Sequence, residues 1–80
     1  MPKLKVLSCN ELLKIFNSFG FEIFSQKGSH IKLRRIENNE KQTLVIPNHK
    51  TLDTGTCRAI LRQASKYIPL GKLSPHFYSD

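Results

Sequence analysis

The chain has 80 residues, enough for one small domain and too few for a multidomain enzyme or a long repeat array. Thirteen lysines and arginines against six aspartates and glutamates give a formal net charge of +7. With 39% hydrophobic residues, the composition predicts a folded globular domain. The charge favours a polyanionic partner such as a nucleic acid, although such a charge also serves solubility alone.

The sequence gives no sign of a membrane segment or a metal site. No apolar run approaches the ~20 residues that would cross a bilayer. The first eight residues lack the apolar core of a signal peptide, so we expect a cytoplasmic protein without a membrane partner. Cys9 and Cys57 are too few for a disulfide scaffold and lack partners at metal-ligand spacing. We expect reduced, partly buried thiols, no metal and no cofactor.

The first predicted helix begins after Ser8 and reaches about Phe19. Ser8 and Glu11 form an S-x-x-E capping box, in which each side chain accepts a hydrogen bond from the other residue's backbone. Gly20 is the expected left-handed stop. The apolar positions share one face: Leu12, Leu13, Phe16 and Phe19.

Three strands are predicted next, over residues 21–26, 29–36 and 43–46. Lys27-Gly28 makes a tight turn between the first two, and 37–40 is a polar hairpin connection with two asparagines that tolerate the left-handed region. Strands joined by short turns predict an antiparallel meander.

The second strand decides which face of this sheet is covered. Ile31 and Leu33 alternate with His30, Lys32 and Arg34. Because successive side chains of a strand point to opposite faces, we expect the first pair to be buried and the other three to face solvent.

A second helix is predicted from the N-cap Thr54 to about Tyr67. Pro69 and Gly71 then break it, and the tail 72–80 either packs its aromatic residues on the domain or docks on a partner. The helix has a buried stripe of Cys57, Ile60, Leu61, Ala64 and Ile68. Its other side carries Arg58, Arg62, Ser65 and Lys66.

The predicted order is therefore α-β-β-β-α, a single α+β domain spanning residues 1–80. Its core covers about 6–68, with a C-terminal tail at 69–80. Two amphipathic helices have one face of a three-stranded antiparallel sheet to cover, which leaves the other face open.

The acidic residues are too few and too scattered for a two-carboxylate hydrolase or a two-metal nuclease, and no nucleotide-binding fingerprint is present. His30 is the candidate for chemistry. A neutral imidazole there would accept the proton of an RNA 2′-hydroxyl or protonate the leaving 5′-oxygen, while neighbouring cations hold the phosphate. The alternative is an ordinary surface histidine on a strand.

Two other groups of residues have two interpretations each. His49, in the loop before the second helix, either closes that loop or provides a second phosphate or acid/base contact. Arg58, Arg62 and Lys66 form either a solvated helix face or a row of phosphate contacts.

Gly28-Ser29-His30, continued by Ile31 to Arg34, resembles the G-S-H strand of the HicA (YcfA-like) toxins. The run from Val45 to His49, followed by Leu52, Gly55-Thr56 and residues 58–64, resembles the second signature of that family. The resemblance covers roughly residues 6–68. Beyond Ile68 the chain departs from many relatives, which leaves the packing of the C-terminus open.

The resemblance implies a double-stranded-RNA-binding-domain-like fold and a metal-independent ribonuclease that cleaves mRNA and arrests translation. It also implies a HicB-like antitoxin that covers the catalytic histidine. Carried over by position, His30 is catalytic and Gly28 allows close approach to it, while His49 matches a recurrent family histidine. The expected RNA-binding residues are Lys27, Gly28, Ser29, Lys32, Arg34, His49, Lys50, Arg58 and Arg62.

Two other function classes remain alongside the toxin hypothesis. One is a non-catalytic RNA-binding module with the same fold. The other is a DNA-binding regulator, which no helix-turn-helix spacing supports.

Overall fold

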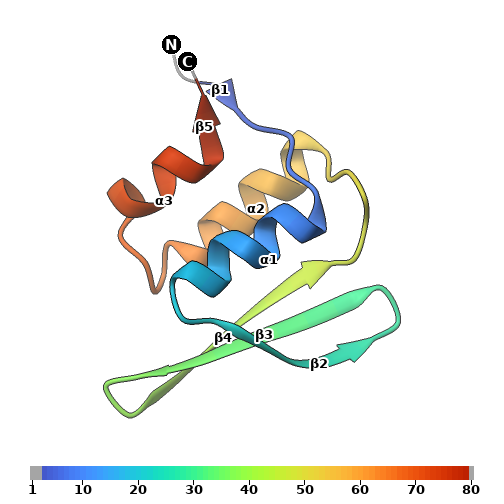
Figure 1. Ribbon diagram of the computed structural model, residues 1–80. Helices are drawn as coiled ribbons and strands as arrows, with labels where there is room; N and C mark the ends of the chain where they lie inside the picture. The colour runs from blue at the N-terminus through green and yellow to red at the C-terminus, as the bar shows by residue number, and fades with distance from the viewer. Residues whose placement is uncertain (1–2, 80) are drawn as a thin grey trace.

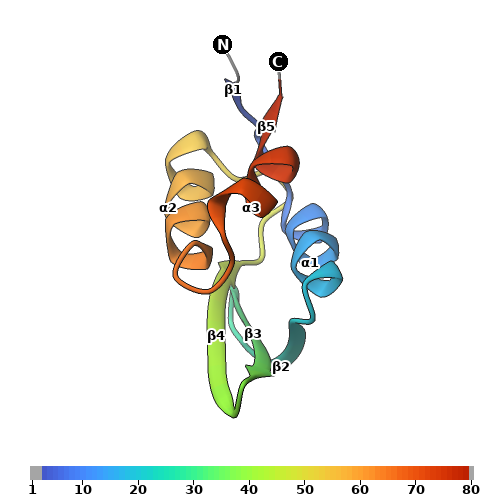
Figure 2. The same ribbon diagram turned by 90° about the vertical axis from the view of Figure 1, so that its left-hand side faces the viewer.

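A three-stranded sheet forms one layer of the protein and the helices form the other, as the computed structural model shows for residues 3–79 (Figures 1 and 2). The predicted α-β-β-β-α order is confirmed for the core, and a third helix and a two-stranded ribbon join it. The elements are β1 (Lys3–Leu4), α1 (Cys9–Ser18), β2 (Glu22–Lys27), β3 (His30–Glu37), β4 (Glu40–Pro47), α2 (Thr54–Ala64), α3 (Leu70–Phe77) and β5 (Tyr78–Ser79).

Local signals fix both ends of α1, as predicted. The Glu11 N–H donates to the Ser8 hydroxyl at 3.1 Å, and the Glu11 carboxylate accepts from the Ser8 N–H at 2.9 Å. At the other end Gly20 has φ 95°, and the Phe21 N–H reaches the Phe16 carbonyl at 3.0 Å. The two phenyl rings meet edge to face with centroids 6.1 Å apart. This left-handed cap turns the chain directly from α1 into β2.

The sheet has the order β2-β3-β4 and is antiparallel throughout. Gly28 takes φ 59° in the β2–β3 turn, and Asn38 and Asn39 take 51° and 64° in the β3–β4 turn. Positive φ at both central residues matches the twist of a two-residue hairpin, so these asparagines continue the ladder up to the turn. As a result β4 covers 40–47, which is longer than the predicted 43–46.

The N-cap of α2 is Asp53, and the prediction of Thr54 was wrong by one residue. The Asp53 carboxylate accepts a hydrogen bond from the Thr56 N–H at 2.7 Å, so Thr54 becomes the first helical residue. The helix ends at Ala64, earlier than the predicted Tyr67, because the chain tightens there into a turn. The predicted stripe is nevertheless buried: Cys57, Ile60, Leu61, Ala64 and Ile68.

Of the two alternatives predicted for the tail, the structure shows packing on the domain. After Pro69 the tail forms α3, which buries Leu73 and Phe77 completely. The Phe77 ring lies 6.0 Å from that of Phe16, centroid to centroid. β5 then pairs with β1, which brings the two ends of the described chain together (Figure 1). Asp80, the last residue of the predicted tail, lies outside the described residues.

The core lies between the sheet and the helices. Cys9 and Cys57 are both buried and unpaired, and burial raises the pKa of the Cys9 thiol. Among residues 3–79, no helix combines the length and apolar character that crossing a membrane would need. Seventeen hydrophobic residues are buried in the part of the chain that the structure describes, and the largest with less than 2% exposure include Phe16, Phe21, Phe77, Leu12, Leu33 and Leu44.

Arg35 joins the two layers where they meet at the ends of α1 and α2. Its guanidinium donates to the carbonyl of Phe19 at 2.8 Å, to that of Tyr67 at 3.2 Å and to the Gln42 side chain at 2.6 Å. It also lies 4.8 Å from the centre of the Phe21 ring. Gln42 is the one buried polar residue among those described, and Arg35 satisfies it.

Candidate nucleic-acid interface

One face of the sheet is open to solvent and carries His30 with several cations. On β3, Ile31 and Leu33 are 3% and 2% exposed and point to the helices, while His30 and Lys32 are exposed and Arg34 is half-buried. The predicted assignment of the two faces is therefore confirmed. His30, Lys32 and Arg34 share the face that no helix covers.

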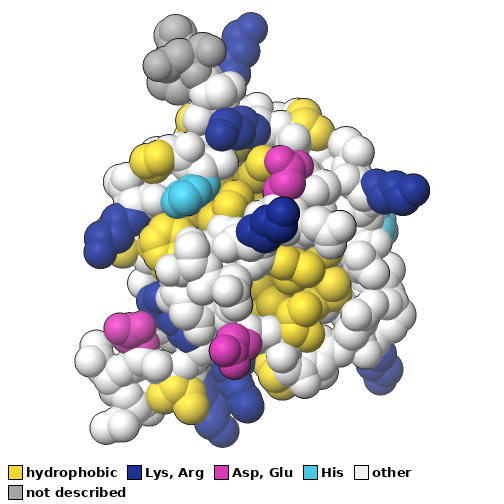
Figure 3. All heavy atoms as spheres, viewed as in Figure 1, with side chains coloured by type: hydrophobic (Ala, Val, Ile, Leu, Met, Phe, Trp, Pro, Cys, Tyr) yellow, Lys and Arg dark blue, Asp and Glu magenta, His cyan; other side chains and the backbone are white. Residues whose placement is uncertain are grey.

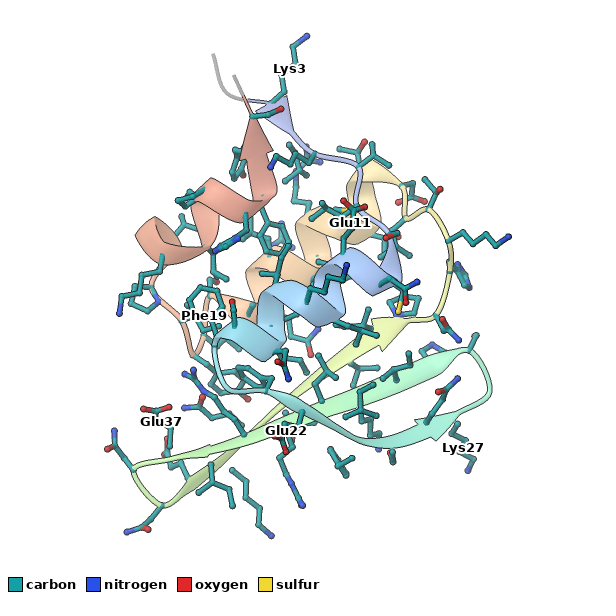
Figure 4. All side chains as sticks on the ribbon, viewed as in Figure 1. Lys3, Glu11, Phe19, Glu22, Lys27 and Glu37 are labelled. Atoms are coloured by element: carbon teal, nitrogen blue, oxygen red, sulfur yellow. The ribbon has the colours of Figure 1, made fainter. Side chains whose placement is uncertain are left out.

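The register places partners from the other strands beside this row. Lys27 of β2 and Pro47 of β4 flank His30, and Ser25 and Val45 flank Lys32. Cross-strand neighbours have Cβ atoms about 4.5–5.5 Å apart. His30 therefore has Lys27 across the ladder and Lys32 about 7 Å further along its own strand. Figure 4 shows Lys27 at the end of β2, on the side of the sheet away from the helices.

The His30 imidazole is exposed, and within residues 3–79 no side chain forms a hydrogen bond with it. Both ring nitrogens are thus accessible to a ligand. An imidazole with one lysine across the ladder and another two residues along its strand can take part in proton transfer to or from a phosphate ester that these cations hold.

The turn before His30 depends on a glycine for its backbone conformation. Gly28 lies at φ 59°, where side chains are strained, yet a Cβ there would meet no atom within 4 Å. Packing within the chain therefore does not require glycine at this position. The space beside the turn is open to an approaching ligand.

The β4–α2 loop is fixed against this turn. The Asn48 N–H donates to the Ser29 carbonyl at 2.6 Å, and the His49 carbonyl accepts from the Cys9 N–H at 3.1 Å. The backbone of His49 thus helps to close the loop, while its side chain and that of Lys50 are exposed. A groove at this end of the molecule is lined by Ser8, Cys9, Asn10, Asn48, His49 and Lys50.

Arg58 and Arg62 do not lie on the open face of the sheet. Both are exposed on α2, in the layer that covers the opposite face of the sheet. The helix is held beside β4 by Gln63, whose side-chain amide accepts from the Val45 N–H at 2.9 Å and donates to the Val45 carbonyl at 3.3 Å. The structure therefore brings Lys27, Gly28, Ser29, His30, Lys32 and Arg34 together and separates the two arginines of α2 from them.

A family model described as "HicA toxin of bacterial toxin-antitoxin" matches residues 9–65 of the chain. The chain belongs to this HicA toxin family. The match runs from the first residue of α1 to the C-cap of α2, so it contains the whole sheet and both predicted helices. β1, α3 and β5 lie outside it. No curated protein and no solved structure gave a match.

The HicA-family domain has a further aromatic residue on the open face, Phe24, which lies in none of the sequence motifs above. The β2–β3 register is irregular between Ile23 and Ser25, so Phe24 is the additional residue of a β-bulge. Its ring lies under the Arg34 guanidinium, with Cζ 4.6 Å from the ring centre. Alternation from the buried Phe21 already indicates an outward Phe24, but nothing in the sequence shows the bulge.

The basic residues of the HicA-family domain are not confined to one patch. Figure 3 shows lysines and arginines spread around the side of the molecule that carries α1 and β2. A groove between these elements is lined by apolar groups, among them Leu13, Phe21, Ile23 and Leu33.

Within residues 3–79, no group of three or more His, Cys, Asp or Glu side chains is placed to hold a metal ion.

Proposed function

We propose that this HicA-family protein is a metal-independent endoribonuclease that cleaves mRNA in the cytoplasm, with His30 as its acid/base group. The observation that supports the proposal most is the position of His30. Its exposed imidazole lies between Lys27 and Lys32 on the uncovered face of the sheet. A protein with a net charge of +7 attracts a polyanion to such a face.

In the proposed reaction the 2′-oxygen of the RNA attacks the adjacent phosphorus, and the bond from phosphorus to the 5′-oxygen breaks. His30 either takes the 2′-hydroxyl proton, with water protonating the departing 5′-oxygen, or protonates the 5′-oxygen, with water taking the 2′-hydroxyl proton. Lys27 and Lys32 hold the phosphate and offset the negative charge that develops on it in the transition state. The products carry a 2′,3′-cyclic phosphate and a 5′-hydroxyl.

The remaining expected RNA contacts are grouped by their place in the fold. Ser29 and Gly28 provide backbone next to the scissile phosphate, and His49 and Lys50 would contact the strand where it passes the end of the sheet. Arg34 lies further along β3. Arg58 and Arg62 would meet only RNA that continues around the domain onto α2.

The partner that this proposal implies is a HicB-like antitoxin. We expect it to cover the open face around His30 and to present acidic groups to the cations there, since charge complementarity steers association. The complex should lose ribonuclease activity in proportion to the bound antitoxin. A complex that retains full cleavage activity would show that the inhibitor binds elsewhere.

One observation favours a second candidate function, that of a non-catalytic RNA-binding module. Catalytic histidines are commonly oriented by a hydrogen bond from a third group, and no described side chain provides one to His30. Such a module would bind RNA through the same cations and cleave nothing.

Expression in a bacterial host separates the two functions. The wild-type protein should arrest growth, co-expression of the antitoxin should relieve the arrest, and His30→Ala should abolish it while the protein accumulates in folded form. His49→Ala is the matched control, for which we expect a smaller effect. Harmless expression of the wild-type protein, or arrest by a folded His30→Ala protein, would refute the proposed catalytic role.

A further inference from the structure

The bulge in β2 places an aromatic ring on the same face as His30. Ile23 stands opposite Leu33 and Ser25 opposite Lys32, so Phe24 has no partner of its own in the ladder. A bulge of this kind redirects a side chain and often lies next to a functional site. Phe24 is 44% exposed, although phenylalanine is one of the residue types most often buried.

Arg34 holds this ring from one side. Its Cζ atom lies 4.6 Å from the ring centre, within the distance of a cation–π contact. Arg34 also belongs to the outward row of β3 with His30 and Lys32. The aromatic ring and the planar guanidinium thus form a partly exposed stack on the basic face.

The spacing between this stack and His30 suits a single RNA strand. Phe24 lies level with the step from Lys32 to Leu33, two to three residues along β3 from His30. At about 3.3 Å per residue, the separation along the strand is roughly 7–10 Å. A strand with one phosphate at His30 would therefore carry a nearby base over Phe24, with Lys32 beneath the intervening backbone.

We propose that Phe24 and Arg34 form a stacking platform for an unpaired base of the RNA substrate. The inference rests on the proposed function and narrows its substrate to single-stranded RNA. Bases inside an A-form duplex are stacked on each other and offer their faces to no protein side chain, whereas bases of single strands stack on aromatic rings and on arginine. Stacking of this kind tolerates any base, so the platform fixes the strand and does not read its sequence.

Binding measured in the His30→Ala background tests the platform without cleavage. The probes are a short single-stranded RNA and the same RNA annealed to its complement. Phe24→Leu keeps an apolar side chain and removes the stacking surface, so the Kd for the single strand should rise about 5- to 150-fold while duplex binding changes less than about twofold. Phe24→Trp should retain binding. Ile23→Ala, on the other side of the same strand and 54% exposed, is the matched control and should change little.

A spectroscopic measurement distinguishes stacking from a structural effect. In the same background, a 2-aminopurine base placed next to the scissile phosphate should lose fluorescence on binding, and Phe24→Leu should abolish this quenching. Unchanged binding and quenching by folded Phe24→Leu would overturn the platform, as would an equal loss for single strand and duplex. Loss of antitoxin binding with normal RNA binding would overturn it too, by assigning Phe24 to the protein interface.

The experimental results distinguish an error in the stacking platform from an error in the proposed function. If the wild-type protein cleaves RNA through His30 and Phe24→Leu binds normally, only the platform is wrong. If the wild-type protein neither binds nor cleaves RNA, the proposed function is wrong, and the platform with it.

Discussion

Arg34 and Arg35 are adjacent in the chain, yet their guanidinium groups lie on opposite faces of the sheet. Arg34 lies over Phe24 on the open face, whereas Arg35 points to the helices and hydrogen-bonds two backbone carbonyls and Gln42. Alternation along β3 explains the difference. The two residues should therefore differ in their contribution to stability.

We expect Arg35→Met to lower the free energy of unfolding by about 2–4 kcal/mol, because it leaves the Gln42 side chain and two carbonyl groups without their donor. Arg34→Met should lower it by about 0.5 kcal/mol or less, since surface substitutions usually have small effects. Urea denaturation of both variants measures the difference. Equal stabilities of the two variants would contradict the role of Arg35 in joining the layers.

The carboxylates that cap the helices predict how stability depends on pH. The hydrogen bond from the Thr56 N–H lowers the pKa of Asp53, and that from the Ser8 N–H lowers the pKa of Glu11. Since both groups ionise more readily in the folded chain, their stabilisation is complete above their unfolded pKa values, near 4, and is lost as the pH falls through the lower folded values.

The double variant Asp53→Asn, Glu11→Gln should therefore show a shallower fall of Tm than the wild-type protein between about pH 5 and pH 3. Asparagine is itself a good N-cap, so the two proteins should differ little in Tm at neutral pH. Thermal unfolding followed by circular dichroism over this range checks the prediction. Parallel profiles for the two proteins would refute it.

Among the helices and strands, the sequence predicts most accurately the features that contacts between nearby residues determine. The limits of α1 follow from Ser8, Glu11 and Gly20, and the outward row of β3 follows from its alternation. The cap of α2 was misplaced because Asp53 and Thr54 are both able to cap, and only the observed backbone shows which hydroxyl or carboxylate oxygen faces Thr56.

Elements that depend on distant contacts were not predicted. Residues 69–75 include two prolines and a glycine, so they have a weak local preference for a helix. The helix α3 exists because Leu73 and Phe77 fill the core. Pairing of β1 with β5 joins opposite ends of the chain. The bulge at Phe24 likewise depends on packing that no local pattern records. The double-stranded-RNA-binding-domain-like description remains a prediction.

If α3 belongs to the core, truncation of Phe77 should be costly. Phe77→Ala should lower the free energy of unfolding by about 3–5 kcal/mol, the usual range for a fully buried phenylalanine. Leu70→Ala in the same helix is the control, because Leu70 is 54% exposed and its loss should cost little. Urea denaturation that finds the two variants equally stable would show that α3 is not part of the cooperative unit.

For the whole molecule, the position of the cations predicts how RNA binding responds to salt. Each phosphate contact with single-stranded RNA contributes about −0.7 to the slope of log K against log salt concentration. Lys27→Gln and Lys32→Gln in the His30→Ala background should each reduce the slope by about that amount. Arg62→Gln should reduce it less, since α2 lies in the other layer. An affinity that hardly changes between low and moderate salt would contradict RNA binding at the basic open face.

The central claim is that His30 on the open face cleaves RNA without a metal ion. Purified protein and a defined single-stranded RNA, incubated in excess EDTA, test it most directly. We predict cleavage by the wild-type protein and a rate about 10²–10⁴-fold lower for His30→Ala, the usual contribution of one acid/base group. The variant should keep the wild-type Tm and RNA affinity. A folded His30→Ala protein that cleaves at the wild-type rate, or a wild-type protein that EDTA inactivates, would contradict the claim.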